Sequence, residues 1–75
     1  MSHKAHYFSA QISQEFSDQV KNLASNLNVP SERIVFKTEG CPVGSIGVYI
    51  KFETKNTLNE FSKKIQAIPC IIKQW

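Results

Sequence analysis

The sequence predicts an α+β domain in which four antiparallel strands form one sheet and two helices cover one of its faces. Three observations support this fold class. Residues 6–12 and 46–53 alternate apolar and polar side chains with the two-residue period of a half-buried strand. Two further stretches space their apolar residues as an amphipathic helix does. A chain of 75 residues is long enough for one small domain with a thin core.

The first strand and first helix follow from this periodicity. Phe8, Ala10 and Ile12 alternate with polar neighbours and therefore share one face of a strand. Ser13 is placed to cap the next helix. The apolar stripe of that helix comprises Phe16, Val20, Leu23, Ala24 and Leu27, and Asn28 and Pro30 end it.

The second half of the chain repeats the pattern with one additional strand. Residues 34–38 form a second expected strand, and residues 46–53 form the third. The run 57–60 (TLNE) matches a capping box, so the second helix is expected to begin there. Its apolar stripe comprises Leu58, Phe61, Ile65 and Ile68. Pro69 ends this helix, and residues 71–75 form the last strand.

The resulting order is strand, helix, strand, strand, helix, strand, which is the ferredoxin-like βαββαβ arrangement. Right-handed crossovers place the strands in the spatial order 4-1-3-2, with both helices on one face. Residues 1–75 are expected to form this single domain, and residues 1–5 are expected to be a flexible N-terminal tail.

Composition narrows the function classes only slightly. The net charge is +3, and the excess lies in residues 51–75, a bias compatible with an acidic partner or nucleic acid. No apolar run approaches the length of a membrane span, and no apolar stretch resembles a signal peptide. We therefore expect a cytoplasmic protein with no membrane partner and with reduced cysteines.

The stretch EGCPVG, residues 39–44, joins the two middle strands and is expected to be a turn. Gly40 and Gly44 can adopt the positive φ that a tight reversal needs. Cys41 lacks the second cysteine of a redox motif and the paired ligands of a zinc site, so we expect no metal and no cofactor. Cys70 falls at the same end of the sheet, which leaves a redox-sensitive pair as an alternative.

No catalytic constellation is evident. The carboxylates fall at exposed or capping positions, and both histidines, His3 and His6, lie at the opposite end of the sheet from Cys41. No histidine follows residue 6 to activate a nucleophile. We therefore expect a protein that is not an enzyme.

The open face of the predicted sheet supplies the candidate binding residues. Alternation places Tyr7 and Tyr49 on the two central strands of this face. The full candidate set comprises Tyr7, Gln11, Lys37, Tyr49, Lys51 and Lys73. Arg33, Val35, Gly47 and Trp75 are expected nearby. Such a face can be a homodimer or partner interface, a nucleic-acid platform, or ordinary amphipathic surface.

Central aromatic residues ringed by lysines resemble the RNA-recognition motif, in which such rings stack on unpaired bases. The run Tyr49-Ile-Lys-Phe52 matches the end of the aromatic octapeptide of that motif. Gly47 stands where a second aromatic residue belongs, and Ser45 stands where a basic residue belongs. The resemblance implies binding of single-stranded RNA or DNA.

The C-terminal half resembles two ferredoxin-like regulatory families, the ACT domain and the effector domain of Lrp/AsnC transcription regulators. The resemblance comprises a strand, a helix of the form LxxFxxxI and the step Ile68-Pro69-Cys70-Ile71, where the families have an Ile-Pro-Gly-Val-like step. It implies a self-associating regulatory module that binds a small polar metabolite. We take this as the leading sequence-based interpretation, with single-stranded nucleic-acid binding as the alternative.

Overall fold

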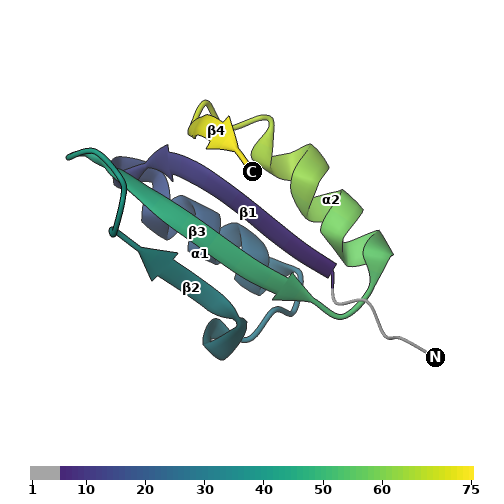
Figure 1. Cartoon of the computed structure of the whole chain (residues 1–75). Coiled ribbons are helices and arrows are strands. Elements are labelled where there is room, and N and C mark those ends of the chain that lie inside the picture. Colours follow the sequence, from purple (N-terminus) through teal and green to yellow (C-terminus); the bar gives the residue numbers. More distant parts are fainter. Residues whose placement is uncertain (1–5) are drawn as a thin grey trace.

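A computed structural model describes residues 6–75 of the chain, and the tail expected at residues 1–5 lies outside the described residues. Four strands form one sheet, and two α-helices pack on one of its faces (Figure 1). The elements in chain order are β1 (His6–Ser13), η1 (Gln14–Phe16), α1 (Ser17–Asn26), η2 (Ser31–Arg33), β2 (Ile34–Lys37), β3 (Ser45–Phe52), α2 (Lys55–Ile65) and β4 (Ile71–Gln74). The predicted ferredoxin-like α+β fold is confirmed.

The sheet has the order β2-β3-β1-β4, which is the predicted order read from the other edge. The central strands β1 and β3 pair antiparallel along their whole length, from His6 opposite Phe52 to Ser13 opposite Ser45. β4 pairs with β1 more briefly, and its register shifts between Gln11 and Ile12. Only the central pair is long, so the position of side chains on the open face is fixed mainly by β1 and β3.

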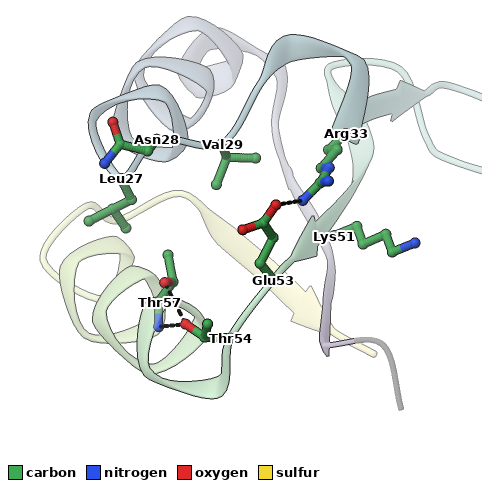
Figure 2. Close-up of a pocket in the computed structure, with 8 residues that line it drawn as sticks. All are labelled: Leu27, Asn28, Val29, Arg33, Lys51, Glu53, Thr54 and Thr57. Atoms are coloured by element: carbon green, nitrogen blue, oxygen red, sulfur yellow. Dashed lines mark hydrogen bonds and ion pairs between the residues drawn. The ribbon is translucent and has the colours of Figure 1, made fainter. Parts of the chain in front are cut away.

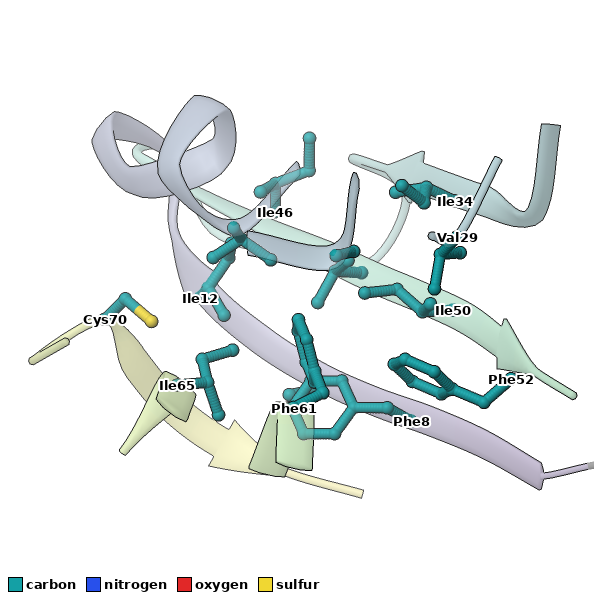
Figure 3. Close-up of a cluster of buried hydrophobic side chains, with 14 residues drawn as sticks. Phe8, Ile12, Val29, Ile34, Ile46, Ile50, Phe52, Phe61, Ile65 and Cys70 are labelled. Atoms are coloured by element: carbon teal, nitrogen blue, oxygen red, sulfur yellow. The ribbon is translucent and has the colours of Figure 1, made fainter. Parts of the chain in front are cut away.

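The core lies between the sheet and the two helices (Figure 3). Phe8, Ala10 and Ile12 of β1 are buried, as the alternation predicts. Phe61 of α2 is fully buried and contacts two strand aromatics edge-on or tilted, with ring centroids 4.9 Å from Phe8 and 5.3 Å from Phe52. These aromatic contacts attach α2 to both central strands.

The expected helix starts are both wrong in detail. Ser13 makes no side-chain capping bond, and a 3₁₀ turn, η1, separates it from α1. The cap of α2 is Thr54, whose hydroxyl accepts a hydrogen bond from the Thr57 backbone N–H at 3.2 Å. Phe52 must stay in the core as the last residue of β3, so only Glu53 and Thr54 remain to turn the chain into the helix. α2 also ends earlier than expected, at Ile65, and Ile68 lies in the turn that follows.

The EGCPVG stretch is a turn, as expected, and Gly40 and Gly44 have φ values of 74° and 90°. Both ends of the turn are closed by backbone hydrogen bonds, from Cys41 to Thr38 and from Ser45 to Pro42. Cys41 is partly exposed and Cys70 is buried, and both are free thiols. The turn and the segment before β4 meet at one end of β1, where Ser13 N–H donates to the carbonyl of Cys70.

Candidate interaction surface on the open sheet face

The face of the sheet opposite the helices carries the largest group of exposed aromatic side chains. Tyr7 is 59% exposed, Tyr49 36% and Trp75 51%, and Val35 on the edge strand β2 is 41% exposed. They lie on this face because successive side chains along a strand point to opposite faces of the sheet, and these side chains point away from the helices. Apolar groups clustered on one face of a small domain indicate an interaction surface.

The strand register places the aromatic residues in a row. Tyr7 lies opposite Lys51 across the β1–β3 pair, and Tyr49 lies opposite Ser9, two residues further along β1. On its other side, Tyr49 lies opposite Val35 of β2. Tyr7, Tyr49 and Val35 therefore form one continuous apolar area on three strands.

A shallow hollow is centred on this area. Its volume is about 240 Å³, and its lining is mainly apolar. The residues that line it are Tyr7, Glu32, Arg33, Val35, Tyr49 and Lys51. Two cationic side chains thus border a hollow whose floor is aromatic and aliphatic.

The lysines of this face are free to bind an external anion. Within residues 6–75, no carboxylate lies within ion-pairing distance of Lys37, Lys51 or Lys73. The Lys37 ammonium instead lies over the Tyr49 ring, 5.6 Å from the ring centroid, which is within the range of a cation–π contact.

Arg33 differs from the lysines because its charge is already paired. Its guanidinium Nη1 donates to Oε1 of Glu53 at 3.0 Å. Figure 2 shows Arg33 directed at the Glu53 carboxylate, while Lys51 extends away from it. The pair is partly solvent-exposed, so it contributes at most about 1 kcal/mol to folding stability.

The six residues selected from the sequence fall into two groups. The first group lies at the hollow: Tyr7, Tyr49 and Lys51 line it, and Lys37 lies over the Tyr49 ring. Gln11 and Lys73 lie opposite each other on β1 and β4, further along the sheet. The Gln11 amide donates to the Ser45 hydroxyl at 3.0 Å, and this hydroxyl donates to the Pro42 carbonyl at 2.8 Å. Gln11 therefore braces the turn as well as facing the open side.

The sequence-based set omits Trp75, which is the largest side chain on the face. Its ring lies nearly parallel to the Tyr49 ring, with centroids 5.7 Å apart and an interplanar angle of 19°. The parity shared with Lys73 places Trp75 near this face from the sequence alone, since residues two apart in a strand point to the same face. The contact with Tyr49 had no such signal.

A second hollow lies at one end of the sheet, between the end of α1 and the start of α2 (Figure 2). Its volume is about 220 Å³. The lining residues are Leu27, Asn28, Val29, Arg33, Lys51, Glu53, Thr54 and Thr57. Several of its polar groups already bind one another, because Arg33 pairs with Glu53 and Thr54 binds Thr57. It therefore offers fewer free groups to a ligand than the open face does.

Among residues 6–75, no three His, Cys, Asp or Glu side chains are grouped closely enough to hold a metal ion. In the same range, no helix is long and apolar enough to cross a membrane.

Comparison with protein-family models, with curated proteins and with solved structures finds no match to this chain. The structure therefore defines the fold of this chain, a ferredoxin-like α+β domain. A fold alone does not specify a function, which depends on the residues of the site.

Proposed function

We propose that this protein is a non-catalytic module that binds single-stranded nucleic acid through the open face of its sheet. The observation that carries the proposal is the combination of exposed aromatic rings with three lysines that have no carboxylate partner within residues 6–75. Tyr7 and Tyr49 would stack on unpaired bases, and Lys37, Lys51 and Lys73 would bind phosphates.

Charge favours this partner over a second copy of the same face. A two-fold dimer packs the same patch of both copies together, so it would bring two positively charged faces into contact. Glu32 is the carboxylate at the rim of the hollow, and Glu53 is occupied by Arg33. A phosphate backbone removes this repulsion because it supplies the opposite charge.

Binding of a fluorescently labelled oligonucleotide of about ten nucleotides, followed by anisotropy, tests the proposal. We expect the Tyr49→Ala variant to lose about 1–3 kcal/mol of binding free energy, because one stacking ring is removed. The triple variant Lys37→Gln, Lys51→Gln, Lys73→Gln should bind more weakly still.

The matched control removes the same charge from the helical layer, as Lys21→Gln, Lys63→Gln, Lys64→Gln. These lysines are exposed on α1 and α2, the elements that cover the other face of the sheet. Equal weakening by the two triple variants would show a non-specific charge effect and would contradict a site on the open face.

The second candidate is the self-associating regulatory module that the resemblance to ACT and Lrp/AsnC domains implies. Its specific support is β2, a four-residue strand at the sheet edge whose Val35 is exposed. Two copies joined at this edge would continue the sheet without packing their two open faces together, and could enclose a small polar metabolite.

Light scattering of the reduced protein separates the two candidates. A monomer that binds oligonucleotide supports the first. A dimer whose mass falls on Val35→Lys substitution, with no oligonucleotide binding, supports the second and contradicts the first.

A further inference from the structure

The side chain of Trp75 extends from the end of β4 across β1 to β3. Its backbone N–H donates to the carbonyl of Ser9 on β1 at 3.1 Å, which extends the β1–β4 pairing by one residue. Its ring nevertheless contacts Gly47, which belongs to β3 on the other side of β1. The side chain therefore lies across the open face instead of extending into solvent.

Gly47 makes this position available. A β-carbon at residue 47 would lie 3.1 Å from Cη2 and 3.3 Å from Cζ3 of Trp75, closer than ordinary van der Waals contact. The indole thus packs directly on the backbone of β3, and a β-carbon at residue 47 would require the ring to shift by a few tenths of an ångström.

The Tyr49 ring holds the indole on a second side, in the nearly parallel arrangement described above. Trp75 remains half exposed although its backbone, Gly47 and Tyr49 all fix its position. A large aromatic surface that is held in place and open to solvent needs little reorganisation to bind a planar ligand.

We infer that Trp75 is a third stacking ring of the nucleic-acid site, and that it occupies the place of the aromatic side chain missing at Gly47. The inference rests on the proposed function and extends it to a residue and a substrate geometry. The three rings lie at three successive residue pairs of the β1–β3 register. Tyr7 belongs to the pair Tyr7–Lys51 and Tyr49 to the pair Ser9–Tyr49, and Trp75 covers Gly47 of the pair Gln11–Gly47.

The spacing of the three rings determines which conformation of a nucleic-acid strand can stack on all of them. Successive positions are two residues apart, or about 6.6 Å along a strand, and the Tyr49 and Trp75 ring centroids are 5.7 Å apart. Bases in a duplex strand are about 3.4 Å apart, so three bases can meet three rings only when the strand is extended and its bases are separated from one another. The inferred site therefore favours an unpaired strand over a duplex of the same sequence.

The chain contains one tryptophan, so its fluorescence reports on this position alone. We would titrate the unaltered protein with a single-stranded oligonucleotide and, separately, with its duplex, and record both probe anisotropy and tryptophan emission. We expect the single strand to bind and to quench the emission, and the duplex to bind at least about 10-fold more weakly.

Variants give a second, independent readout by anisotropy. Trp75→Ala should weaken binding between about 5-fold and 150-fold, the range observed for loss of one stacked aromatic. Trp75→Phe keeps a ring and should restore most of the affinity. Val43→Ala removes an exposed apolar side chain from the turn and should leave the affinity unchanged.

The outcomes distinguish this inference from the proposed function. Single-strand binding with no change in emission, and with equal affinity in Trp75→Ala, overturns the role of Trp75 and leaves the module's function standing. Tighter binding by Trp75→Ala also overturns it, because the ring would then be an obstacle. Absence of any oligonucleotide binding overturns both.

Discussion

Gly47 shows how a single residue determines the character of the open face. In the aromatic octapeptide of the RNA-recognition motif, which residues 49–52 resemble, an aromatic residue stands at the position of Gly47. In the structure the absent side chain makes room for Trp75, which brings a ring from a distant part of the chain. The face therefore carries a third exposed aromatic ring, which comes from the residue after β4 and not from β3.

At the same scale, the burial of Cys70 makes the folding stability depend on pH. Desolvation by burial raises the pKa of the Cys70 thiol above its ordinary value of 9.0, and a backbone hydrogen bond partly offsets this. The unfolded chain therefore releases this proton at a lower pH than the folded chain does. The stability contribution is complete below pH 9.0 and is lost as the pH rises through the folded-state pKa.

We expect the free energy of unfolding to fall as the pH rises above 9.0, with a component from Cys70 of at most about 1.4 kcal/mol per pH unit. Urea unfolding of the protein and of Cys70→Ala across this range measures it. The variant should be less stable at the lower pH because of the lost packing, but its stability should decline less steeply. Equal slopes in the two proteins would contradict the assigned cause.

At the scale of elements, the helix ends are less predictable from sequence than the helices themselves. The apolar stripe of α2 identifies Phe61 and Ile65 as core residues, and both are buried. The capping box at residues 57–60 is also present in the sequence, yet the helix begins one turn earlier, after Thr54. Thr54 and Thr57 could each serve as the N-cap of α2. Thr54 is the N-cap because β3 ends at Phe52, two residues before it.

The Thr54 cap gives a direct test of that boundary. Thr54→Ala should cost about 1 kcal/mol of stability, because the Thr57 N–H loses its acceptor. Thr54→Ser keeps a hydroxyl and should cost clearly less. Denaturant unfolding measures both. A larger loss for Thr57→Ala than for Thr54→Ala would instead support a helix that starts at Thr57.

At the scale of the whole molecule, the lysines within residues 6–75 are divided between two layers. Lys37, Lys51 and Lys73 lie on the strands, whereas Lys21, Lys55, Lys63 and Lys64 lie on the helices. A net charge of +3 therefore understates the local charge of the open face, where the neighbouring carboxylates are few and Glu53 is paired. A localised charge of this kind gives binding a defined salt dependence.

If three lysines neutralise three phosphates of a single strand, the logarithm of the binding constant should fall with the logarithm of salt concentration with a slope of about −2. Anisotropy titrations at several salt concentrations measure this slope. It should approach zero in the triple variant of Lys37, Lys51 and Lys73. A slope of about −2 that persists in that variant would locate phosphate binding elsewhere on the molecule.

The fold was largely predictable, and the site was predictable in part. Strand order, the helical face and the buried residues of β1 follow from periodicity and the handedness of crossovers. The same alternation places Tyr7, Tyr49 and the lysines on the open face. It does not reveal that Gln11 is bound to Ser45 or that Arg33 is bound to Glu53, because these pairs lie 34 and 20 residues apart.

The sequence by itself therefore determined the elements, their order and the side of the sheet on which each residue lies, because local periodicity encodes these features. Only the tertiary structure decided which of those residues touch. Trp75 covers Gly47 and stacks on Tyr49 because β4 pairs with β1 in one particular register, and β1 pairs with β3 in another. That register is fixed by packing and hydrogen bonds between distant segments, which no local pattern of residues specifies.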